Sequence, residues 1–294
     1  MRVISFGDSF TAGLGTNRKV EEKFYKGVPK HRLPEARAKH RKYIVERSFT
    51  KYLADKLKCT YINEGAIGCN NNDIVNSIVR FGLEKKFNKD DLVVVSFTST
   101  LRDKLPFLPS QINDQHRPGI TWSIKELSLL ENFDATLIEF ISDENNFKIA
   151  NKDGYANKEE LLAYGKFNYT YHEFCKKYVI DMHDYSYLDY FNLNMIAFLQ
   201  IYFNVNNVKY IFADAFEHSY NGSCYDKVDK LDLRNYFEFG KNTYSTILTS
   251  MNDRTLLEDD GYNINNLVSL HPSYKGHKVI ANLLHKFYQS VYEN

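Results

Sequence analysis

Glycine, proline and cysteine are scarce in this chain, and neither sign of charge dominates. The 294 residues include 14 Gly, 6 Pro and 4 Cys, which excludes a collagen-like chain or a proline-rich linker. The 38 Lys and Arg residues against 37 Asp and Glu give a formal charge of +1, so no overall field favours nucleic acid or a membrane surface. No apolar run approaches the ~18 residues of a membrane span, and the stretch Val3-Ile4-Ser5 before Gly7 is too short for a secretory signal. We therefore expect a cytoplasmic protein without membrane contact.

The four cysteines lie far apart and form no C-x-x-C pair. They are Cys59, Cys69, Cys175 and Cys224. Such spacing in a cytoplasmic protein favours free thiols, with two disulfides as the alternative.

The composition is that of a folded protein with a large core, because 43% of the residues are hydrophobic and 15% aromatic. Four short apolar segments have the pattern of strands. They are residues 2–6, 59–63, 92–97 and 209–213. Helical spacing of apolar residues marks four further segments. They are residues 43–58, a helix N-capped by Asp73, residues 188–203 and residues 275–292.

Strands that alternate with helices predict an α/β fold with a doubly wound, mostly parallel sheet between two helical layers. The Leu-Val-Val-Val run within 92–97 is typical of a central strand that is covered on both faces. Periodicity weakens between residues 103 and 185. We therefore predict a single domain over 1–294, with a helical or irregular insertion at about 103–185.

Polar residues follow the predicted strands at positions where parallel sheets collect reactive groups. Ser9 follows the first strand, a Gly-rich loop at 63–68 follows the second, and Thr98-Ser99-Thr100 follows the third. Reactive groups in open α/β sheets gather beyond these carboxyl ends. A nucleophilic serine also needs a base and donors for the oxyanion, and His271 precedes the final helix.

Three sequence blocks together resemble the SGNH, or GDSL-type, hydrolases. The blocks are Phe6-Gly7-Asp8-Ser9-Phe10-Thr11-Ala12-Gly13, Asn63-Glu64-Gly65-Ala66-Ile67-Gly68 and His271-Pro272-Ser273-Tyr274-Lys275-Gly276-His277. The resemblance implies the flavodoxin-like SGNH fold, with Ser9 as nucleophile, His271 as base and the Gly68 N–H as an oxyanion donor. It implies no cofactor. His277 is interpreted as a packing or capping residue.

The chain departs from the family's pattern at two positions. Thr100 stands where the family has an oxyanion-binding asparagine, so we expect its hydroxyl, or the charged side chain of Arg102, to contact the substrate. Val268 stands where the family has the acid that orients the histidine. A main-chain carbonyl near Val268 would leave a Ser–His dyad; the alternative is an acid from elsewhere, namely Asp214, Asp259 or Asp260.

Two polar residues near the blocks are further candidates for substrate binding. Asn70 lies in a loop that is otherwise interpreted as simply polar, and Asp8 is alternatively expected to bond to loop backbone. The segment 17–42 carries ten basic and three acidic residues. It is either a solvated loop or an attractor for an anionic substrate, and it has no recognised nucleic-acid motif.

No metal site is predicted. The cluster His172, Cys175, Asp181, His183 and Asp184 matches no zinc spacing. The sequence thus predicts a serine ester hydrolase for a small O-acyl or other carboxylic ester, on a small molecule or glycan that is anionic. The alternative is a catalytically degenerate scaffold of the same fold that binds an anionic or glycan ligand.

Overall fold

The computed structural model describes residues 1–15, 24–99, 102–105, 120–123, 185–216, 228–264 and 267–293. The chain divides into two compact units. The first comprises Met1–Leu105 and Ser186–Asn294, and the second is Pro106–Tyr185. Strand β4 (Arg102–Leu105) belongs to the first unit, and strand β5 (Ile120–Ser123) belongs to the second. The insertion at 103–185 within a single domain stays a prediction.

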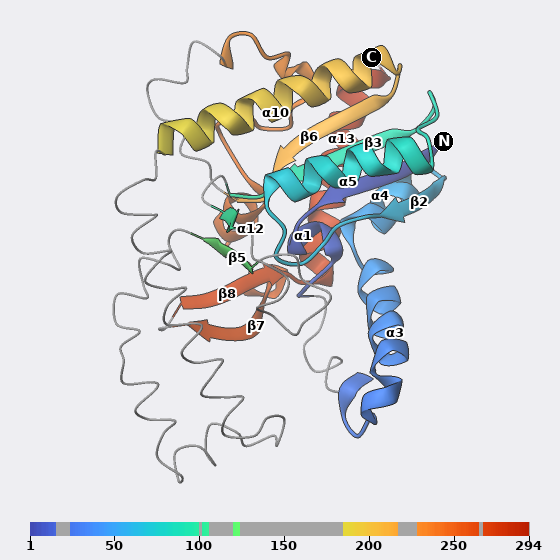
Figure 1. Cartoon of the computed structure of the whole chain (residues 1–294), viewed down its shortest axis with the longest axis vertical. Helices are drawn as coiled ribbons and strands as arrows, with labels where there is room; N and C mark the ends of the chain where they lie inside the picture. Colours follow the sequence, from blue (N-terminus) through green and yellow to red (C-terminus); the bar gives the residue numbers. More distant parts are fainter. Residues whose placement is uncertain are drawn as a thin grey trace. The chain divides into compact units, whose positions relative to one another are not determined.

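A four-stranded parallel sheet forms the centre of the first unit (Figure 1). Its strands are β1 (Arg2–Gly7), β2 (Thr60–Asn63), β3 (Leu92–Phe97) and β6 (Lys209–Asp214), in the order β2-β1-β3-β6. All neighbours are parallel. Counted along the chain the order is 2-1-3-4, which is how flavodoxin-like sheets begin. The predicted α/β class and doubly wound sheet are confirmed.

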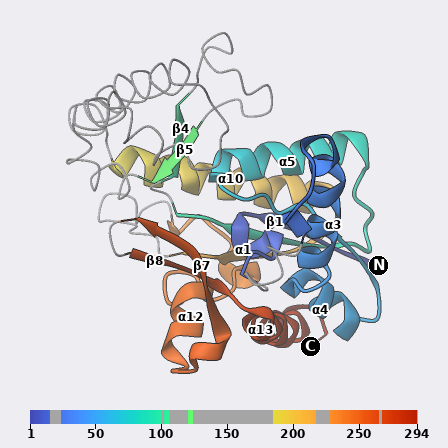
Figure 2. The ribbon, with the colours of Figure 1, turned by 90° about the horizontal axis from the view of Figure 1, so that it is seen from below.

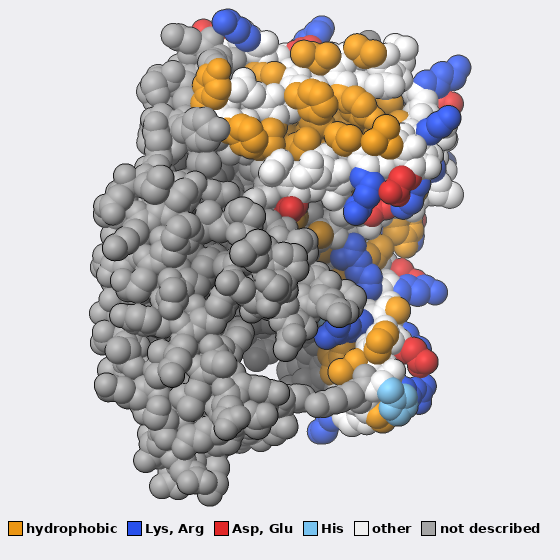
Figure 3. Space-filling view, viewed as in Figure 1, with side chains coloured by type: hydrophobic (Ala, Val, Ile, Leu, Met, Phe, Trp, Pro, Cys, Tyr) orange, Lys and Arg blue, Asp and Glu red, His pale blue; other side chains and the backbone are white. Residues whose placement is uncertain are grey.

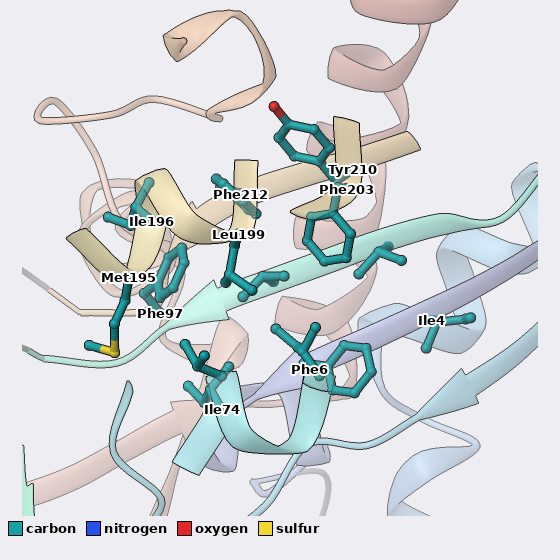
Figure 4. Close-up of a cluster of buried hydrophobic side chains, with 14 of the residues drawn as sticks. Ile4, Phe6, Ile74, Phe97, Met195, Ile196, Leu199, Phe203, Tyr210 and Phe212 are labelled. Carbon is teal, nitrogen blue, oxygen red and sulfur yellow. The ribbon is translucent and has the colours of Figure 1, made fainter. Parts of the chain in front are cut away.

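Two helical layers cover the sheet, because its central strands are apolar on both faces. Alternate side chains of β3 enter two different core clusters. The cluster with Val93, Val95 and Phe97 lies under α5 (Asn71–Glu84) and α10 (Tyr185–Val205) (Figure 4). The cluster with Leu92 and Val94 includes side chains of α4 (Phe49–Lys56) and α13 (Tyr274–Tyr292). Figure 2 shows the two layers on opposite sides of the sheet.

Two predicted helix boundaries are wrong. The segment 43–58 is divided between α3 (Leu33–Val45) and α4. Helix α3 also contains residues 33–42 of the basic segment 17–42. Helix α5 begins at Asn71, with Asn70 as its N-cap instead of Asp73. Asp73 is the third helical residue and completes a capping box with Asn70. Either residue type can cap a helix.

An antiparallel ribbon of β7 (Leu257–Ile264) and β8 (Leu267–Pro272) precedes the last helix and was not predicted. His271 therefore lies in a strand rather than in a loop. The remaining elements are short helices. They are α1 (Ser9–Ala12), η1 (Lys30–Arg32), η6 (Leu233–Asn235), α12 (Tyr244–Ser250) and η7 (Arg254–Leu256).

Among the described residues, no helix has the length and apolar character needed to cross a bilayer. Cys59 and Cys69 are free thiols. Cys175 and Cys224 lie outside the described residues.

Candidate active site

Ser9 is the first residue of α1, directly after the turn that ends β1. Asp8 is the N-cap: the Phe10 N–H donates to Asp8 Oδ1 (3.0 Å). The Thr98 hydroxyl donates to Asp8 Oδ2 (2.8 Å). Asp8 is 0% exposed, and its bond to the Phe10 N–H is the backbone-capping role that was the alternative; substrate contact by Asp8 stays a prediction. Its two carboxylate oxygens fix the start of α1 and hence the position of Ser9.

His271 and Ser9 are in hydrogen-bonding contact although 262 positions separate them in the sequence. The distance from His271 Nε2 to Ser9 Oγ is 2.8 Å, and both residues are buried. A base must reach within about 2.6–3.2 Å of the proton it removes. The predicted juxtaposition of the two groups is therefore present, while their catalytic roles remain a prediction.

Two neighbours from the N-terminal segment fix the position of His271. The Phe10 ring lies 5.4 Å from the imidazole, centroid to centroid. Gly15 has a left-handed φ of +89°, and a Cβ there would lie 2.5 Å from the Cβ of His271. Only glycine fits this position without displacing the histidine. Sequence reasoning did not single out Gly15, because the contact depends on tertiary packing.

The register of the β7–β8 ribbon places Glu258 opposite His271 and Asn263 opposite Val268. The acids considered from the sequence, Asp259 and Asp260, belong to the same strand. The side chains of Glu258, Asp259 and Asp260 lie outside the described residues. Asp214 is at the end of β6, where its Oδ1 accepts a hydrogen bond from the Tyr236 hydroxyl (2.6 Å). An orienting role for Asp214 remains a prediction.

Asn63 joins the second sequence block to α1 and α4, and sequence reasoning missed this role. Its Nδ2 donates to the Thr11 carbonyl (2.6 Å) and to the hydroxyls of Ser48 and Thr50 (3.1 Å each). Its Oδ1 accepts from the Gly65 N–H (3.0 Å). An asparagine that bonds to the backbone two residues later is a turn signal that is readable from sequence.

The loop that carries Gly68 is anchored beside the end of β1. The Ala66 N–H donates to the Gly7 carbonyl (2.8 Å), and Cys69 Sγ contacts the same oxygen at 3.4 Å. The loop on either side of Gly68 is therefore held at the end of β1, two residues before Ser9; an oxyanion role for Gly68 stays a prediction. Gly68 has φ +73°, and the space that a Cβ would fill is open.

Arg41 of α3 braces the same loop. Its Nη2 donates to the Gly65 carbonyl (2.6 Å), and burial lowers the pKa of the guanidinium from its usual value. The end of α3 also reaches α1, since a Cβ on Gly13 would lie 2.6 Å from the Ile44 carbonyl oxygen. The basic helix thus ends against the two segments that surround Ser9.

The third strand ends in a buried amide contact. The Thr98 N–H donates to Asn71 Oδ1 (2.8 Å), and Asn71 Nδ2 donates to the Thr98 carbonyl (3.0 Å) and to Asn192 Oδ1 (2.8 Å). Asn71 thus fixes the end of β3 to α5 and α10.

The remaining predicted site residues are only partly described. Thr100 lies outside the described residues, as does the side chain of Arg102 in β4. The Asn70 carboxamide oxygen accepts from the Asp73 N–H (2.9 Å) as a helix cap, and substrate contact by Asn70 stays a prediction. The cluster considered for a metal, residues 172–184, also lies outside the described residues.

His277 is a packing residue, as predicted. It is 0% exposed, and its Nδ1 accepts a hydrogen bond from the Phe49 N–H (3.3 Å). Burial lowers its pKa to about 3, so the ring is neutral at ordinary pH.

Searches against protein-family models and against curated proteins find no match. Two solved structures are similar over nearly the whole chain. The first is a protein from Desulfitobacterium hafniense DCB-2 that is assigned to the G-D-S-L lipolytic family. Its TM-score is 0.40 and its sequence identity 11%, and the match covers 97% of this chain and 98% of that one. The second, a member of the lipolytic protein G-D-S-L family from Veillonella parvula DSM 2008, has a TM-score of 0.29 and 12% identity, over 100% and 99%.

Proposed function

We propose that this protein is a serine ester hydrolase, with Ser9 as nucleophile and His271 as general base. The observation that carries the proposal is the 2.8 Å contact between His271 Nε2 and Ser9 Oγ. A buried serine bonded to an imidazole at the end of a parallel strand has the geometry that nucleophilic acyl transfer requires.

The reaction has two stages. Ser9 Oγ attacks the ester carbonyl while its proton passes to His271 Nε2; the alcohol then leaves with that proton, and an acyl-enzyme remains. Water next gives a proton to His271 as it attacks the acyl group, and the return of that proton to Ser9 Oγ releases the acid. The first stage requires His271 to be neutral beforehand.

Backbone N–H groups would stabilise the oxyanion. Ser9 is the first residue of α1. The N–H groups in the first turn of a helix have no intrahelical acceptor, since no helical carbonyl lies four residues before them. The Gly68 N–H is the second donor that we propose, since its loop is anchored to Gly7. Loss of one such donor typically costs about 3–4 kcal/mol of transition-state stabilisation. Thr100 is the proposed third donor.

The substrate class that we propose is an O-acyl or other carboxylic ester on an anionic small molecule or glycan. Support comes from α3, which exposes Arg37, Lys39 and Lys42 and ends against α1. A basic helix next to the site raises the local concentration of anions. The double charge reversal R37E/K39E is expected to raise KM for an anionic ester while KM for a neutral ester stays unchanged.

A fluorophosphonate probe tests the chemistry directly, because it labels only an activated serine. We expect labelling of the unmodified protein, and its loss in Ser9→Ala and in His271→Ala. Ser250→Ala, which changes an exposed serine, and His285→Gln, which changes a partly exposed histidine, are matched controls that should label normally. Absence of labelling in the folded, unmodified protein would refute the hydrolase and support the degenerate ligand-binding scaffold.

A further inference from the structure

Helix α10 exposes a mainly apolar stripe on the face that points away from the sheet. The stripe residues recur at intervals of three and four, which is the spacing of a helix that packs against another helix. The apolar ones are Phe191, Phe198, Ile201 and Val205, and the polar Asn194 lies between Phe191 and Phe198. Figure 3 shows hydrophobic side chains gathered along this helix. Ile201 is 64% exposed and Val205 75%, far more than apolar residues of a core.

Helix α5 extends the stripe. A Cβ on Gly82 would meet the Tyr202 hydroxyl of α10, so the two helices are in close contact at this point. The next residue, Leu83, is 77% exposed. Together the exposed apolar residues of the two helices offer roughly 600 Å² of surface. Single proteins rarely leave a larger contiguous patch uncovered, and a polar rim would bring it to the ~800 Å² per partner of a stable dimer.

The charge of this face indicates what covers it. Residues 190–205 of α10 contain no Asp, Glu, Lys or Arg, whereas Leu83 of α5 is followed by the exposed Glu84, Lys85 and Lys86, which carry both signs of charge. A membrane-binding helix would place basic residues beside its apolar stripe, and a polyanion would need them on the face itself. In a two-fold interface every group meets the same surface of its partner, so a charged stripe would repel its own copy. A neutral stripe carries no such penalty.

The exposed polar residues of the face are also compatible with a second copy. Asn194 and Asn204 are exposed on α10. A carboxamide is both a donor and an acceptor, so asparagines from two copies can hydrogen-bond to each other. Neither residue presents a charge that would require a partner of a different kind.

We propose that the exposed stripe of α10, together with Leu83 of α5, is a homodimer interface in which a second copy of this chain packs across a two-fold axis. The interface is separate from the residues of the candidate active site, so it stands whether or not the protein hydrolyses esters.

Sedimentation velocity at micromolar concentrations tests the proposal. We expect a species of twice the 34.4 kDa chain mass for the unmodified protein. Ile201→Glu should raise the dimer Kd by at least about 100-fold, since burying like charges against each other costs several kcal/mol. Met251→Glu is the matched control, because Met251 is an exposed hydrophobic residue at the end of α12, and it should remain dimeric.

A charge-swap pair separates loss of the interface from loss of folding. Ile201→Glu and Ile201→Lys should each be monomeric alone, and an equimolar mixture should form a heterodimer. A monomeric unmodified protein would overturn the proposal; protection of α10 from hydrogen exchange would then assign the face to another segment of the same chain. A dimer that survives both substitutions would also overturn it.

Discussion

Lowering the pH should destabilise the protein through His277. The imidazole is 0% exposed and its pKa is lowered to about 3, because burial disfavours the charged form. The unfolded chain binds a proton on this histidine below about pH 6.5, whereas the folded protein does not. Stability is therefore fully present above pH 6.5 and is lost progressively as the pH falls toward 3.

His277 stays neutral in the folded protein over this pH range. The size of the effect therefore depends only on the pKa of this histidine in the unfolded chain. Between pH 7.5 and pH 5.5 the unfolded state gains about 1.4 kcal/mol from protonation of this histidine. The measurement is the free energy of unfolding in urea at several pH values, followed by far-ultraviolet circular dichroism. The single tryptophan is unsuitable as a probe, because Trp122 belongs to β5 of the second unit.

The comparison that isolates His277 uses His277→Gln, whose carboxamide oxygen can still accept from the Phe49 N–H. We expect this variant to lose about 1.4 kcal/mol less than the unmodified protein between the two pH values. His285→Gln, a partly exposed control on the same helix, should keep the full pH dependence. If all three proteins lose stability equally, the buried neutral histidine does not contribute as argued.

Three substitutions near the candidate site give further predictions. Asn63→Ala removes four hydrogen bonds and should lower the free energy of unfolding in urea by about 2–4 kcal/mol. The control Asn206→Ala, at an exposed residue, should lower it by less than about 1 kcal/mol. Equal losses would contradict the role of Asn63. Gly15→Ala should slow fluorophosphonate labelling at least tenfold by displacing His271, and Gly27→Ala, a left-handed glycine with open space around it, should not. Glu258→Gln should slow labelling more than Asp214→Asn, because the strand register places Glu258 opposite His271; the reverse order would favour Asp214.

The sheet could be predicted from sequence because its strands carry an unambiguous pattern. The run Leu92–Phe97 is apolar throughout, and all six residues are buried. The ribbon of β7 and β8 could not be predicted, since Leu257–Ile264 contains mainly polar residues and glycine. Its pairing depends on neighbours in space rather than on a local apolar alternation.

The candidate site divides in the same way. Ser9 and His271 could be predicted because each stands in a short block with a fixed position relative to a strand or helix. The supporting residues Arg41 and Gly15 could not, because their contacts join segments that are distant in sequence. For Asn63, only the turn to Gly65 could be predicted locally. Arg41 shows the difficulty well: within a basic segment, nothing local distinguishes the one guanidinium that bonds to the Gly65 carbonyl.

The 262-residue separation of Ser9 and His271 has a consequence for synthesis on the ribosome. Ser9 is synthesised first, and its imidazole partner follows 262 positions later in the chain. Under the proposed mechanism, a nascent chain or a fragment that lacks His271 would hold an ordinary alcohol rather than a nucleophile. Reactivity of Ser9 toward an acylating probe would therefore report that the whole first unit has assembled.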